Sequence, residues 1–201
     1  FGSSRLALGL DPIVCFASKS FALPRERRRE LVAVSGVPVC LADACGCGIY
    51  LDVGTAQHRL RPVLEELCTM VASHGGDPET CWSAMARDER ERLRIFRHAL
   101  PETVNTIIAE TRRRHPVVTK LGTDMAVPDD RLEDVLRLYR ENLDAARLPY
   151  VVFGHIGDNH VHVNILPRDP EQYAAGRALY QHFAREVVRM GGSPAAEHGV
   201  G

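Results

Sequence analysis

The densest group of chemically capable residues lies in one short segment, which contains His155, His160, His162 and Asn164. Asp158-Asn159 interrupts this segment in the manner of a two-residue hairpin turn. With that turn, His155 and His162 face each other across two antiparallel strands. Opposed residues have Cβ atoms about 4.5–5.5 Å apart, so two imidazoles can reach one ion at Zn–N distances of about 2.0–2.1 Å. The spacing therefore predicts a metal-binding hairpin.

Alternation along the strands separates polar from apolar side chains. The histidines and Asn164 fall on one face, and the other face carries Ile156, Val161, Val163 and Ile165. His160 would lie opposite Gly157, nearer the turn, so we expect His155 and His162 to be the better-placed ligands. Glu197 follows the last helix and adds a carboxylate. His155, His162 and Glu197 would then supply the N/O ligands of an open divalent-metal site, with Zn²⁺ as the first candidate.

The surrounding pattern alternates helices and strands. Helical spacing is present in four segments, near residues 60–71, 88–114, 132–143 and 170–190, and extended segments are predicted at 48–53, 117–127, 149–156 and 161–166. A short helix at Pro24–Leu31 and a strand at Cys81–Met85 are further expectations. Because the histidine hairpin is antiparallel, we predict an α+β fold with an antiparallel sheet and helices packed on one face. The order is compatible with two ferredoxin-like halves.

Composition narrows the function classes. The 201 residues include 25 Lys plus Arg and 26 Asp plus Glu, so the charge balance favours neither nucleic acid nor an acidic membrane as partner. No run approaches the roughly 18 apolar residues of a membrane span. The six cysteines show no paired zinc spacing and are expected to be reduced thiols. We expect one domain over 1–201 and a cytoplasmic or membrane-peripheral location.

Four segments together carry a family resemblance. In chain order they are Leu93–Glu102, Thr123–Pro128, Gly154–Asp158 with His162 and Asn164, and Glu197–Gly201. In this order they resemble the C-terminal cap domain of FAD-linked oxidases of the vanillyl-alcohol-oxidase type, a group with D-lactate dehydrogenases, the glycolate oxidase flavin subunit and D-2-hydroxyglutarate dehydrogenase. The resemblance covers about residues 48–201. Asn159-His160 stands where relatives commonly show Gly-Asn, and Ala195-Ala196 where Ser-Gly often occurs.

The resemblance implies a role for each site residue. His155, His162 and Glu197 would hold the metal, and His198 would be the general base where flavin and substrate meet. Arg97 would bind the carboxylate of a small 2-hydroxy acid, and Asn164 would orient substrate or a ligand. Arg97 can equally be read as a helix-surface arginine. Lys120 is a second candidate for the carboxylate, and Asp124 is expected to shape a strand end.

The implied redox chemistry needs FAD, and these residues contain no glycine-rich pyrophosphate loop. We therefore expect a flavin-binding domain in cis or in trans, with self-association left open. One alternative is a metal-binding module that docks onto a separate flavin protein without catalysis of its own. Another is an independent metal-assisted hydrolase, although no leaving-group acid is apparent.

Overall fold

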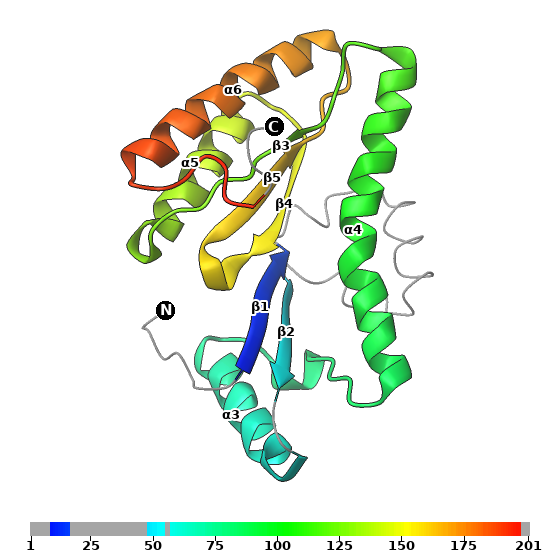
Figure 1. Ribbon diagram of the computed structural model, residues 1–201, viewed down its shortest axis with the longest axis vertical. Coiled ribbons are helices and arrows are strands. Elements are labelled where there is room, and N and C mark those ends of the chain that lie inside the picture. Colours follow the sequence, from blue (N-terminus) through cyan, green and yellow to red (C-terminus); the bar gives the residue numbers. More distant parts are fainter. Residues whose placement is uncertain (1–8, 17–47, 55–56, 198–201) are drawn as a thin grey trace.

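The computed structural model of the chain describes residues 9–16, 48–54 and 57–197 (Figure 1). The helix predicted at Pro24–Leu31 and the predicted base His198 lie outside the described residues. Within the described ranges, no helix is both long enough and apolar enough to cross a membrane.

The sheet has five antiparallel strands in the order β2-β1-β4-β5-β3. Their bounds are Gly48–Gly54 for β2, Gly9–Phe16 for β1, Tyr150–His155 for β4, His160–Ile165 for β5 and Leu121–Gly122 for β3. The α+β class and the antiparallel sheet are thus confirmed. The ferredoxin-like halves are not shown. No strand forms at the predicted Cys81–Met85, which has no regular structure.

Two helices cover one face of the sheet. These are α5, Leu132–Ala145, and α6, Pro170–Arg189, and their inner residues pack against Val152, Val161 and Val163. The Tyr139 and Phe183 rings meet edge to face at 4.9 Å in this core. The Asp169 side chain begins α6 by accepting a hydrogen bond from the backbone N–H of Gln172 at 2.8 Å. Burial of this apolar face fixes which face of the hairpin is left for a site.

A third helix covers part of the opposite face, so the expectation of helices on one face only was wrong. Helix α4, Arg87–Arg114, buries Leu100, Val104 and Ile108 against Val151 of β4. Figure 1 shows the sheet with α4 on one side and α5 and α6 on the other. The cause lies in β4, whose residues on the histidine face are apolar at Val151 and Phe153 and need cover.

The remaining α-helix among the described residues is α3, Leu60–Ser73, which ends before Gly75-Gly76. Helix α4 begins at Arg87, one residue before the start of the helical spacing expected near residue 88. There, the Glu89 carboxylate accepts a hydrogen bond from the backbone N–H of Ala86. A short 3-10 helix, Asp129–Arg131, precedes α5.

Candidate metal centre

The hairpin register differs from the prediction. The connection is a 3-10 turn at Ile156–Asp158 followed by Asn159, so His155 pairs with His160 and Phe153 pairs with His162. Asn159 has a left-handed φ of 51°, and its side-chain amide donates to Asp129 Oδ1 at 2.6 Å. The longer turn shifts the register by two residues. Because two residues is the period of a strand, the histidines remain on one face.

Close packing of β4 on β5 depends on Gly154. A Cβ at this position would lie 2.5 Å from the carbonyl oxygen of His160 and 2.9 Å from the backbone nitrogen of His162. Glycine therefore permits the approach that puts His155 beside the two histidines of β5. The ring centroid of His155 lies 6.0 Å from that of His160 and 6.2 Å from that of His162.

His162 is held by the chain segment that follows β3. Its Nδ1–H donates to the carbonyl oxygen of Thr123 at 2.7 Å, which leaves Nε2 as a lone-pair donor for a metal. The Thr123 hydroxyl accepts the backbone N–H of Val163 at 2.8 Å and so fixes this segment against β5. Burial lowers the pKa of His162 below its usual value, which favours the neutral, ligating imidazole.

His160 is fixed by Asp124. Its Nε2–H donates to Asp124 Oδ1 at 3.0 Å, and the His160 side chain is only 4% exposed. The same carboxylate accepts the backbone N–H of Glu197 at 3.2–3.3 Å. Asp124 thus orients one histidine and anchors the segment that carries Glu197, rather than only shaping a strand end.

Glu197 reaches the cluster because the chain after α6 turns back along residues 124–126. Ser193 and Ala126 exchange backbone hydrogen bonds at 2.9 and 3.0 Å, and the N–H of Ala196 donates to the carbonyl oxygen of Asp124 at 2.8 Å. Gly192 permits this pairing, since a Cβ there would lie 2.3 Å from the Ala126 carbonyl oxygen. The return segment thereby places a carboxylate in front of the histidine face.

The three predicted ligands come together. One ligand atom from each of His155, His162 and Glu197 lies within 4.8 Å of the others, and a second such group is Asp124, His160 and His162. His155 Nε2 lies 3.4 Å from Glu197 Oε1, and His162 Nε2 lies 4.0 Å from Glu197 Oε2. Two imidazoles and a carboxylate are a donor set suited to a divalent ion with open positions.

Arg97 lies on the same face of the sheet as the histidines. Tyr50, Val14, His155 and His160 form one row across the sheet, since each is paired with the next. Paired residues share a face, and Tyr50 lies two strand spacings, about 10 Å, from His155. The Arg97 guanidinium carbon lies 5.7 Å from the Tyr50 ring centroid. This cation–π contact directs Arg97 toward the sheet rather than into solvent.

Asn164 and Lys120 also lie on the histidine face. Asn164 is 2% exposed, and a Cβ at its β3 partner Gly122 would lie 2.7 Å from Asn164 Oδ1 and 3.4 Å from Lys120 Cε. Glycine at 122 therefore makes room for both side chains. Asn164 is two residues from His162 on β5, about 7 Å along the strand.

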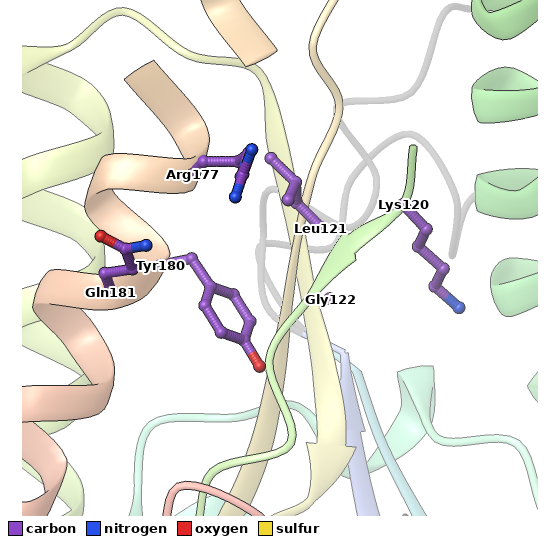
Figure 2. A pocket seen from close by; sticks show the side chains of 6 residues that line it. All are labelled: Lys120, Leu121, Gly122, Arg177, Tyr180 and Gln181. Carbon is purple, nitrogen blue, oxygen red and sulfur yellow. The ribbon is translucent and has the colours of Figure 1, made fainter. Parts of the chain in front are cut away.

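A hollow of about 360 Å³ lies at the β3 edge of the sheet, apart from the histidines. It is lined by Lys120, Leu121, Gly122, Arg177, Tyr180 and Gln181. Figure 2 shows Arg177, Tyr180 and Gln181 approaching from α6, whereas the Lys120 side chain points away from them. No predicted metal ligand lines this hollow, although Lys120, the second candidate for the carboxylate, does.

The roles of His160, Asp124 and Thr123 differ from what the sequence predicts. The predicted two-residue turn places His160 opposite Gly157, but His160 faces His155. Asp124 acts through its contact with His160, 36 residues away in the sequence. The Thr123 carbonyl acts through its contact with His162, 39 residues away. The order Thr123-Asp124 before the hairpin gave no local signal for either contact.

Comparison with known proteins identifies a family and several distant relatives. Residues 33–201 match the family described as FAD linked oxidases, C-terminal domain. The chain is 25% identical over 116 residues to the mitochondrial D-lactate dehydrogenase (cytochrome) 1 of Saccharomyces cerevisiae. The matched residues cover 58% of this chain and 20% of that protein. A D-lactate dehydrogenase of Kluyveromyces lactis is 25% identical over 151 residues, which cover 74% of this chain and 25% of that protein.

A D-2-hydroxyglutarate dehydrogenase of Pseudomonas putida is 36% identical over 80 residues, covering 39% of this chain and 8% of that protein. The chain therefore spans a quarter or less of the length of these relatives. The family match extends from before β2 through the hairpin and Glu197. On this ground the chain belongs to the family of FAD-linked oxidase C-terminal domains.

Proposed function

We propose that this chain is the substrate- and metal-binding domain of an FAD-dependent 2-hydroxy-acid dehydrogenase or oxidase of the D-lactate, glycolate or D-2-hydroxyglutarate type. The observation that carries the proposal is the convergence of His155, His162 and Glu197 within 4.8 Å on one sheet face. The family match and the similarity to dehydrogenases of D-lactate and D-2-hydroxyglutarate support it.

The donor set fits a divalent metal. His162 donates through Nδ1 to the Thr123 carbonyl oxygen. Its other nitrogen, Nε2, therefore carries a lone pair that faces the Glu197 carboxylate. His155 Nδ1 is buried and has no hydrogen-bond partner among the described residues, while its Nε2 faces Glu197. A cation between these donors would relieve the repulsion between the His162 Nε2 lone pair and the Glu197 carboxylate. Zn²⁺ or a similar ion there would bind the α-hydroxyl and carboxylate and lower the hydroxyl pKa.

The remaining residues would position the substrate. Arg97, which lies over the Tyr50 ring, would pair its guanidinium fork with a substrate carboxylate. Asn164, on the ligand face, would orient the substrate or His162. His198 adjoins Glu197 in the sequence and would accept the hydroxyl proton.

FAD would supply the hydride acceptor for the α-carbon, so that loss of the hydroxyl proton and the hydride yields a 2-oxo acid. A flavin-binding domain, in cis or in trans, would bring the flavin to the face that carries the histidines. The C-terminal return segment, which carries Glu197 and then His198, would lie where the two meet.

Metal analysis tests the carrying observation. The purified chain should hold one divalent ion per molecule, and His162→Ala should lose it. His98→Ala, an exposed α4 variant, is the matched control and should retain it. Equal metal content in wild type and His162→Ala would contradict the proposed site.

Calorimetry with the metal-loaded chain tests the substrate role. D-lactate and D-2-hydroxyglutarate should be compared as ligands of wild type and Arg97→Met, in which the apolar stem remains. Losing a charge-assisted hydrogen bond of about 1.5–3 kcal/mol should weaken binding by about 10- to 150-fold. Unchanged affinity for both acids in Arg97→Met would exclude Arg97 from the substrate site.

A further inference from the structure

His160 is built into the cluster more firmly than either predicted histidine ligand. Its side chain is 4% exposed, against 21% for His155 and 14% for His162. It lies directly opposite His155, and its ring centroid is 4.3 Å from that of His162. His160 is therefore enclosed within the proposed metal site although it is not one of the three proposed ligands.

The tautomer of His160 is fixed by its partner. Asp124 accepts the Nε2–H at 3.0 Å, so the second ring nitrogen, Nδ1, presents a lone pair. That lone pair lies 3.6 Å from Glu197 Oε1, the same oxygen that lies 3.4 Å from His155 Nε2. In a tetrahedral site with bonds of about 2.0–2.1 Å, neighbouring donor atoms lie about 3.3 Å apart. Both separations approach the spacing of donors around one ion.

We propose that His160 is a fourth protein ligand of the metal, through Nδ1, with Asp124 as the carboxylate that orients it. This inference rests on the proposed function, since it assigns a further donor to the same centre. The carboxylate–histidine–metal arrangement is a common way to fix ligand orientation and raise ligand basicity.

A fourth protein donor changes which ion suits the site. Four protein ligands complete a tetrahedron and leave a tetrahedral Zn²⁺ no position for substrate. A six-coordinate ion keeps two positions, which match the hydroxyl and carboxylate oxygens of a 2-hydroxy acid. The site therefore favours an ion that accepts six N/O ligands, such as Mn²⁺, Fe²⁺ or Co²⁺. Its four protein ligands would be His155, His160, His162 and Glu197.

Nitrogen NMR of the wild-type chain tests the contact without a substitution. The chain is labelled with ¹⁵N-histidine, and Zn²⁺ is added as a diamagnetic probe at constant pH. His160 Nδ1 should move from the position of a free lone-pair nitrogen, while its Nε2–H signal persists on Asp124. The opposing interpretation is an imidazolium ion paired with Asp124 and Glu197. A His160 Nδ1 signal unmoved by metal, while His155 and His162 respond, would overturn the inference.

Cobalt spectroscopy and metal affinity provide the second test. In wild type, Co²⁺ should give the weak visible bands of six-coordination, and His160→Asn should give stronger bands of a lower coordination number. The Kd for Co²⁺ should rise at least about 100-fold in His160→Asn, beyond the 10- to 100-fold typical of an indirect contact. His98→Ala should match wild type.

The outcomes separate the two proposals. If His162→Ala abolishes metal binding and His160→Asn changes neither the Kd nor the spectrum, the metal centre stands and the fourth ligand is refuted. If the wild-type chain binds no divalent ion, the proposed function fails and the inference fails with it.

Discussion

Replacing Gly154 by alanine should destabilise the hairpin and weaken the metal site together. The added Cβ would lie 2.5 Å from the His160 carbonyl oxygen and 2.9 Å from both the His162 nitrogen and the Val161 Cα. All three atoms belong to the backbone of β5 and cannot rotate away, so the strands must separate. Forced overpacking of this kind costs about 1–3 kcal/mol. Gly154 also has a φ of +157°, which adds a backbone cost of about 1–3 kcal/mol for alanine.

Gly191→Ala is the matched control. Gly191 also has a positive φ, 81°, but the nearest atom to its added Cβ is Pro128 Cγ at 3.8 Å. It should lose only the conformational part, about 1–2 kcal/mol. Urea unfolding with unchanged m-values should therefore show Gly154→Ala less stable than Gly191→Ala by about 1–3 kcal/mol. Metal affinity should fall only in Gly154→Ala, because His155 is displaced. Equal unfolding free energies for the two variants would refute the steric reasoning.

Three further predictions follow from the core, the last helix and the return segment. Phe183→Ala should lower the free energy of unfolding by about 3–5 kcal/mol, because it empties the core beside Tyr139; a loss below about 1 kcal/mol in urea unfolding would contradict this packing. Asp169→Ala should cost about 1 kcal/mol through loss of the α6 cap, and Asp169→Asn should recover most of that loss in the same assay. Glu197→Ala should weaken metal binding, whereas His198→Ala should leave the metal bound and, in a full-length enzyme, lower the rate by about 10²- to 10⁴-fold. The reverse pattern in a metal titration would exchange the two roles.

The sequence by itself determined which side chains share a face. Alternation assigned the histidines and Asn164 to one side of the hairpin and the valines to the other, and this assignment is confirmed although the predicted register is wrong. A register shift of two residues exchanges partners without exchanging faces, because the strand period is two. The α6 cap was likewise readable, since Asp169-Pro170 acts on its own backbone within three residues.

Only the tertiary structure decided which atoms meet on that face. The turn length depends on Asn159, whose left-handed conformation is held by Asp129, a partner 30 residues away. Helix α4 lies over Val151 because β4 is apolar on both faces, a demand that β5 alone does not reveal. Asp124 brings His160 and Glu197 together through contacts across 36 and 73 residues. Local patterns specify orientation along a strand, whereas contacts between distant segments form only when the packed core brings their backbones within hydrogen-bond distance.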